Sequence, residues 1–70
     1  MDIKLIEGSA TLSLDNGTPQ TVNAGDPLAS FKASDYNTIS TNASQTATLQ
    51  FATDSSILRL DQNTRIKLVA

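Results

Sequence analysis

The sequence predicts an all-β fold, a small antiparallel β-sandwich or β-roll of about seven to eight short strands. Three observations predict it. Apolar and polar residues alternate with a period of two in several segments, the spacing that sends one set to each face of a strand. Turn sequences rich in Asn, Asp and Gly separate these segments. No segment carries an apolar stripe at helical spacing, so we expect little helix beyond a turn near residues 33–36.

In the first half of the chain, alternating segments are separated by strong turn signals. The expected strands cover residues 3–7, 9–14, 20–23 and 28–31. Asp15-Asn16-Gly17 follows the second of these, and Asn-Gly favours the positive φ angles of a type I′ hairpin turn. Pro19 has no N–H, so the return strand should begin late or lie at an edge. Residues 24–27 form a second tight turn.

The second half contains a repeated pattern of apolar pairs: Leu49 and Phe51, Leu58 and Leu60, Ile66 and Leu68. The expected strands cover residues 37–41, 45–51, 56–60 and 64–69. A third break is expected at 33–35, and short polar connectors at 52–55 and 61–63. Connectors this short favour sequential hairpins, but they also suit a short β-solenoid-like stack. The pattern leaves both topologies open.

Length and composition bound the function. Seventy residues make a single domain, 1–70, with a small core. The chain has no Cys and no His and a net charge of −2, which argues against disulfides, zinc sites and nucleic-acid binding. It contains no apolar run long enough to span a membrane and no signal peptide at its start. We expect a domain excised from a larger envelope or exported protein.

The order of motifs from residue 24 to residue 68 resembles the FecR-type β domain of bacteria. The matching motifs are an opening Gly-Asp turn, a hydrophobic-Thr element, an alternating strand, a DGS-like turn, an L-x-L strand, an Asn-Thr turn and a last alternating strand. In this sequence they are Gly25-Asp26, Ile39-Ser40-Thr41, residues 47–51, Asp54-Ser55-Ser56, Leu58-Arg59-Leu60, residues 61–64 and residues 65–68.

The resemblance implies a β module in the periplasm or at the cell surface. FecR-type domains occur in inner-membrane regulators that relay a receptor's state to a sigma factor, and in large envelope proteins. Two turns depart from the family pattern. Ser55 replaces the central Gly of the DGS-like turn, so we expect a backbone without positive φ there. Ser34-Asp35 stands where many members have a second Gly-Asp.

The sequence gives no catalytic set, so we expect no enzyme. Most of the seven acidic residues stand in or beside turns, where Asp bonds the nearby backbone. No cofactor is expected; the one metal considered is calcium, with oxygen ligands from Asp54, Asp61 and Asn63. The candidate interaction surface comprises Arg59, Arg65, Lys67 and Tyr36. The three cations alternate with apolar residues and would share one exposed face if their strands paired.

The predicted function is therefore a non-catalytic, extracytoplasmic module for protein–protein interaction, in cell-surface signalling or as a structural part of an envelope protein. A protein partner is expected, with no nucleic acid and no membrane span in this chain. Binding would occur by strand addition to an exposed edge, either near residues 19–22 or along 64–69. The alternative is a carbohydrate- or small-ligand-binding module, although one Tyr, two Phe and no Trp give little stacking surface.

Overall fold

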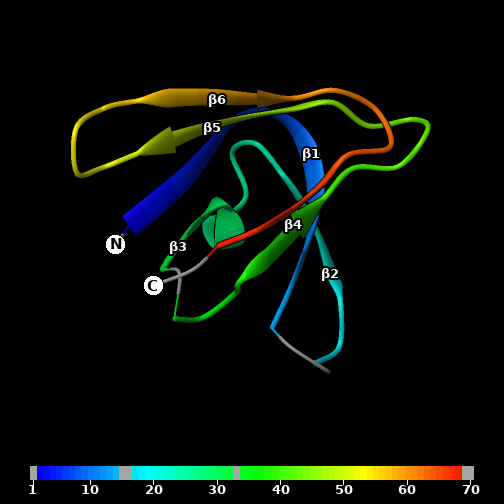
Figure 1. The fold of residues 1–70 in the computed structure, drawn as a ribbon. Helices are drawn as coiled ribbons and strands as arrows, with labels where there is room; N and C mark the ends of the chain where they lie inside the picture. The colour runs from blue at the N-terminus through cyan, green and yellow to red at the C-terminus, as the bar shows by residue number, and fades with distance from the viewer. Residues whose placement is uncertain (1, 15–16, 33, 69–70) are drawn as a thin grey trace.

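The computed structural model describes residues 2–14, 17–32 and 34–68, and it shows seven antiparallel strands in one curled sheet (Figure 1). The strands are β1 (Asp2–Ser13), β2 (Gln20–Asn23), β3 (Ser30–Lys32), β4 (Thr38–Ser40), β5 (Ala47–Phe51), β6 (Ile57–Leu60) and β7 (Arg65–Lys67). A single 3₁₀ turn, η1 (Pro27–Ala29), stands between β2 and β3. No helix in these residues has the length and apolar character of a membrane span.

The long strand β1 organises the fold because four other strands pair with it. Its first half lies between β3 and β5, and β6 continues that section beyond β5. Its second half lies between β2 and β4, and β7 continues that section beyond β4. The sheet curls along β1, so the β5–β6 pair and the β2 and β4 strands lie on different sides of the molecule (Figure 1).

An irregularity in β1 reverses which residues face the core. The register with β5 shifts between Leu5 and Glu7, so one extra residue is inserted into β1. Before this bulge the buried side chains are odd-numbered (Ile3 and Leu5), and after it they are even-numbered (Ala10 and Leu12). An inserted residue produces this switch because side chains alternate with a period of two. The two strands expected at 3–7 and 9–14 are therefore one bent strand.

Gly8 makes the bend possible. Its φ angle is +80°, and a Cβ atom at this position would lie 1.9 Å from the carbonyl oxygen of Thr46. Backbone hydrogen bonds form on both sides of β1 at this point. The N–H of Ser9 donates to the carbonyl oxygen of Thr46 over 3.1 Å, and the N–H of Ala24 donates to the carbonyl oxygen of Gly8 over 2.9 Å. Only glycine has both the backbone freedom and the space for this position.

The core lies inside the curl and is contributed by both sections of the sheet. Its largest fully buried side chains are Ile3, Leu5, Leu12, Val22, Ile39 and Leu49. Buried Thr41 ties the second section to the connector before β7. Its N–H donates to the carbonyl oxygen of Thr64 over 2.8 Å, and its hydroxyl accepts from the N–H of Thr64 over 3.0 Å and donates to the carbonyl oxygen of Asp61.

The structure confirms the all-β class and corrects several details. Every pairing is antiparallel, so the solenoid-like stack is excluded. Of the last three expected strands, the first two form the expected hairpin, β5–β6, but the third does not continue it, because β7 pairs with β4 instead of β6. The strand expected at 28–31 begins only at Ser30, since Pro27 starts a 3₁₀ turn closed by a bond from the Ala29 N–H to the Asp26 carbonyl oxygen.

Two turn predictions have different outcomes. The hairpin between β1 and β2 is confirmed by their pairing, while Asp15 and Asn16 of its turn, like Ala33 of the third break, lie outside the described residues. The expectation of a turn without positive φ at Ser55 is wrong, because Ser55 has φ +61°. The Asp54 carboxylate accepts hydrogen bonds from the Ser56 N–H and hydroxyl, which stabilises the tight turn without a glycine.

Candidate functional site

Edge strands are the feature of this fold that can bind another chain. In the part of the chain that the structure describes, β2, β3, β6 and β7 each pair with one neighbouring strand. The outer side of each strand therefore presents backbone N–H and C=O groups to solvent, which is a template for strand addition. The four edges differ in how far these groups are already satisfied.

The β2 edge is largely closed by an aspartate and a proline. The register with β1 directs the backbone groups of Thr21 and Asn23 outward. The N–H of Asn23 donates to Oδ2 of Asp26 over 2.9 Å, and the N–H of Asp26 donates back to the carbonyl oxygen of Asn23 over 3.1 Å. Pro19 precedes the strand and has no N–H to offer. The first of the two predicted binding edges therefore retains little beyond the backbone groups of Thr21.

An aspartate bonds the end of β3 in the same way. The N–H of Lys32 donates to Oδ2 of Asp35 over 3.2 Å, and the carbonyl oxygen of Lys32 accepts from the N–H groups of Asp35 and Tyr36. The aspartate three residues after the strand end thus occupies the outward backbone groups of Lys32, while the register with β1 directs those of Ser30 outward as well. This role agrees with the prediction that the aspartates mainly form turns.

The β7 edge, the second predicted binding edge, carries charge. The Arg65 and Lys67 side chains are exposed, whereas Ile66, which pairs with Ile39, is partly buried against the core. Charged side chains on an edge strand disfavour the approach of another strand, because pairing would remove their water. Val69 of the predicted 64–69 strand lies outside the described residues.

The β6 edge has no aspartate that bonds its outward backbone groups among the hydrogen bonds of the described residues, and it carries one charged side chain, Arg59, where β7 carries two. The N–H of Phe51 donates to the carbonyl oxygen of Ser56 over 2.9 Å, which fixes the phase of the β5–β6 ladder. Hydrogen-bonded and non-hydrogen-bonded pairs alternate in an antiparallel ladder, so Leu58 directs its backbone groups toward β5. The N–H and C=O groups of Ile57 and Arg59 therefore point outward, and no other strand of the described chain pairs with them.

The side chains of β6 leave apolar surface on both faces of this edge. Ile57 is 52% exposed and Leu58 is 37% exposed, although Leu58 pairs with Leu49, which is fully buried. Leu58 is therefore a core-facing side chain that lacks a neighbour on its outer side. A strand added to β6 would extend the core over Leu58. In the sequence, the L-x-L pattern around Leu58 predicts a strand but does not indicate that this strand lies at an edge.

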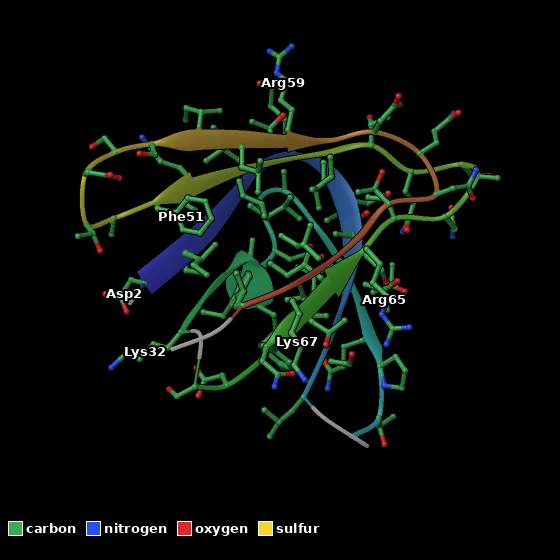
Figure 2. All side chains as sticks on the ribbon, viewed as in Figure 1. Asp2, Lys32, Phe51, Arg59, Arg65 and Lys67 are labelled. Carbon is green, nitrogen blue, oxygen red and sulfur yellow. The ribbon has the colours of Figure 1, made fainter. Side chains whose placement is uncertain are left out.

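The structure does not form the single cationic face predicted from Arg59, Arg65 and Lys67. β6 and β7 belong to different sections of the sheet and do not pair. Figure 2 shows Arg59 projecting outward from β6, while Arg65 and Lys67 lie apart from it, beside β4. The prediction failed because it assumed that consecutive strands pair, and the partner of β7 is distant in sequence.

Tyr36, the fourth predicted surface residue, is partly buried and packs against the core. Its ring contacts the ring of Phe31 edge-to-face, with 5.8 Å between the ring centroids and 81° between the planes. This contact holds the aromatic ring in place as part of the fold. Tyr36 therefore belongs to the rim of the core, and it does not lie beside Arg59 on the β6 edge.

The predicted calcium ligands are not brought together. Asp54 precedes β6, while Asp61 and Asn63 follow it, so strand β6 separates them by more than about 10 Å. The hydrogen bonds from the Ser56 hydroxyl and N–H lower the pKa of Asp54 below its ordinary value. Among the described residues, no group of three or more acidic, His or Cys side chains is arranged to hold a metal ion.

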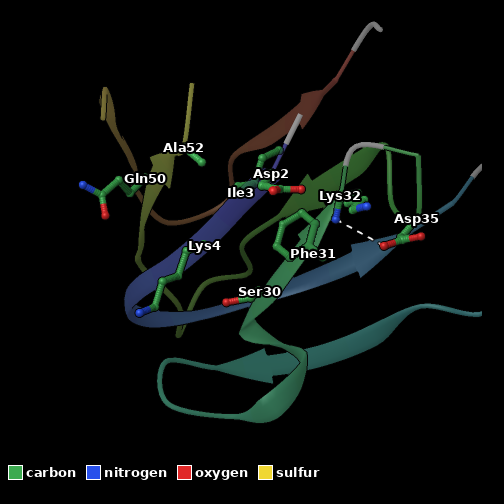
Figure 3. Close-up of a pocket in the computed structure, with 9 residues that line it drawn as sticks. All are labelled: Asp2, Ile3, Lys4, Ser30, Phe31, Lys32, Asp35, Gln50 and Ala52. Carbon is green, nitrogen blue, oxygen red and sulfur yellow. Dashed lines mark hydrogen bonds between the residues drawn. The ribbon is translucent and has the colours of Figure 1, made fainter. Parts of the chain in front are cut away.

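A surface depression of about 500 Å³ lies over β1, β3 and β5 (Figure 3). Its charged side chains are Asp2, Lys4, Lys32 and Asp35, and the two positive charges balance the two negative ones. Figure 3 also shows the bond between the Lys32 N–H and Asp35 at the end of β3. The depression has no excess charge that would select a charged ligand.

Comparison with known proteins adds no relative. No family model matches this chain, and neither a curated protein nor a solved structure matches it.

Proposed function

We propose that this chain is a non-catalytic, FecR-like interaction module of the extracytoplasmic space, which binds an extended segment of a partner protein at strand β6. The observation that carries the proposal is the contrast between the edges. Asp26 and Asp35 bond the outward backbone groups at the ends of β2 and β3, which leaves one outward residue in each, whereas Ile57 and Arg59 of β6 both present outward backbone groups beside exposed apolar side chains. The motif order of residues 24–68 supports the FecR-like character and the location.

The energetics favour a modest affinity. Each backbone hydrogen bond gained by strand addition contributes about 0.5–1.5 kcal/mol net. Covering the exposed third of Leu58 adds about 0.5–1 kcal/mol, taking full burial of a Leu side chain as about 1.5–3 kcal/mol. A partner strand with apolar residues on the Leu58 face and acidic residues near Arg59 complements both faces of the edge. Such binding suits a reversible signalling or assembly contact.

A peptide experiment tests the binding site. The probe is a peptide of about 8 residues in which Val and Glu alternate, which is long enough to cover a strand of ordinary length. Added to the isotope-labelled chain, it should slow amide hydrogen exchange at Ile57 and Arg59. The variant Arg59→Pro removes an outward N–H without removing a bond to β5 and should abolish the effect.

Thr21→Pro is the matched control, because the Thr21 N–H also points outward but belongs to β2, outside the proposed site. It should leave peptide binding unchanged. Protection that appears at β2 or β7 and spares β6 would contradict the proposed site. The location is tested separately by the sequence that flanks this chain in its gene. A membrane helix and a sigma-binding region before it would support a signalling role. A flanking sequence that makes the chain part of a cytoplasmic enzyme would contradict the proposed location.

A further inference from the structure

We infer that β6 also binds a second copy of this chain, in an antiparallel strand pair whose twofold axis passes through Leu58. The inference rests on the proposed function of β6 as an open edge and names a partner for it. It follows from the order of three exposed residues, Ile57, Leu58 and Arg59, and from the direction of their backbone groups.

The backbone of β6 is self-complementary. The outward N–H and C=O groups belong to Ile57 and Arg59, which stand at equal distances on either side of Leu58. When two copies approach in antiparallel orientation, Ile57 of one chain can face Arg59 of the second copy and exchange both ladder hydrogen bonds with it. The same exchange occurs at the other end of the pair, because a twofold interface contains each contact twice.

The side chains select this register over its neighbours. With Leu58 on the axis, the two Leu58 side chains face each other in a non-hydrogen-bonded pair, where side chains are closest. Each of them covers the surface that is left 37% exposed in the single chain. Moving the axis to Arg59 would place two guanidinium groups directly opposite each other, which is unfavourable. Moving it to Ile57 would leave Leu58 opposite the polar Ser56.

The ends of β6 limit the contact to a short ladder. Ser55 has φ +61° and uses its N–H to bond the carbonyl oxygen of Phe51, so the strand cannot continue in that direction. An interface this small buries less than the roughly 1,200 Å² typical of stable complexes. The dimer is therefore weak and concentration-dependent, with the two β3–β1–β5–β6 sections joined into one continuous sheet.

Sedimentation velocity between about 10 µM and about 1 mM, a range that brackets weak association, tests the inference. The apparent mass should rise from the 7.4 kDa of one chain toward twice that value. Arg59→Pro should remain monomeric across the range, while the matched control Thr21→Pro should dimerise like the parent chain. A dimer that persists in folded Arg59→Pro would overturn the inference, whereas the proposed function is tested on its own by peptide protection at Ile57 and Arg59.

A charge-pairing experiment tests the register and does not depend on the proline variants. Leu58→Lys and Leu58→Glu each place like charges on the axis, so each should be monomeric alone, and an equimolar mixture should form the mixed dimer. Failure of the mixture to associate while the parent chain dimerises would overturn the Leu58 axis. If the parent chain stays monomeric but the Val/Glu peptide still protects Ile57 and Arg59, self-pairing is wrong and the proposed function stands.

Discussion

Replacing Gly8 by alanine tests the reasoning behind the bend in β1. A left-handed backbone conformation costs an L-residue about 1–2 kcal/mol. The new Cβ would also lie 1.9 Å from the Thr46 carbonyl oxygen, so the two segments must separate. Separation breaks the bond from the Ser9 N–H to that oxygen, which costs about another 1 kcal/mol. We therefore expect Gly8→Ala to lower the free energy of unfolding by about 3 kcal/mol.

The size of this effect is large for so short a chain. At about 0.05–0.15 kcal/mol per residue, the whole domain is stable by about 4–10 kcal/mol. Urea unfolding followed by far-UV circular dichroism measures the loss, and the midpoint of thermal unfolding should fall by about 12–24 °C. The midpoint should fall without a change in the denaturant m-value, because the surface exposed on unfolding is nearly the same.

Gly25→Ala is the matched control. Gly25 has φ +94°, but a Cβ at this position would have no atom within 4 Å. This substitution therefore carries only the conformational cost, about 1–2 kcal/mol. The difference between the two variants isolates the contact with Thr46. Equal losses in the two variants, or a loss at Gly8 no larger than about 1 kcal/mol, would refute the close approach that bends β1.

Three further predictions concern hydrogen bonds to side chains. Thr41→Val leaves two backbone groups without their hydroxyl partner and should lower the free energy of unfolding by about 1–3 kcal/mol in urea titrations; no loss would contradict the role of this hydroxyl. The pKa of Asp54 is lowered chiefly by the Ser56 hydroxyl and next by the Ser56 N–H, so its contribution to stability is complete above the unfolded pKa and is lost as the pH falls through the folded one. Ser56→Ala should raise the pKa of Asp54 in an NMR titration, and an unchanged titration would exclude the hydroxyl as the main cause. Asp26→Ala should speed amide exchange at Asn23, whose N–H loses its acceptor; unchanged exchange would show that the β2 edge is closed by other means.

Much of the fold was predictable because side-chain alternation is a local property. The described strands lie within or close to the expected ranges, and the late start of β2 after Pro19 was indicated by the missing N–H. The bend in β1 is also present in the sequence as a switch from odd to even core positions between Leu5 and Ala10. From the sequence, this change of core-facing positions predicts two separate strands. Alternation shows which face a side chain takes, but it does not show whether the strand is continuous.

The candidate site was not predictable to the same degree. The expected binding edges were 19–22 and 64–69, and the expected cationic face combined Arg59 with Arg65 and Lys67. In the structure Pro19 and the bonds of Asp26 to Asn23 leave only Thr21 with outward backbone groups near the first edge, and β7 pairs with β4 and not with β6, the strand of Arg59. Both outcomes depend on which strands pair, and the residues that form such pairs are far apart in the chain.

The β class, the strand positions and the face that each side chain takes follow from local sequence alone, because they depend on a two-residue repeat and on turn residues acting over a few positions. The tertiary structure adds that β1 is shared by both sections of the sheet and that, in the described chain, β6 has a paired strand on one side only. Leu58 illustrates the physical reason. Its alternation marks it as core-facing, but its exposure depends on the missing neighbour beyond β6, which no local pattern encodes.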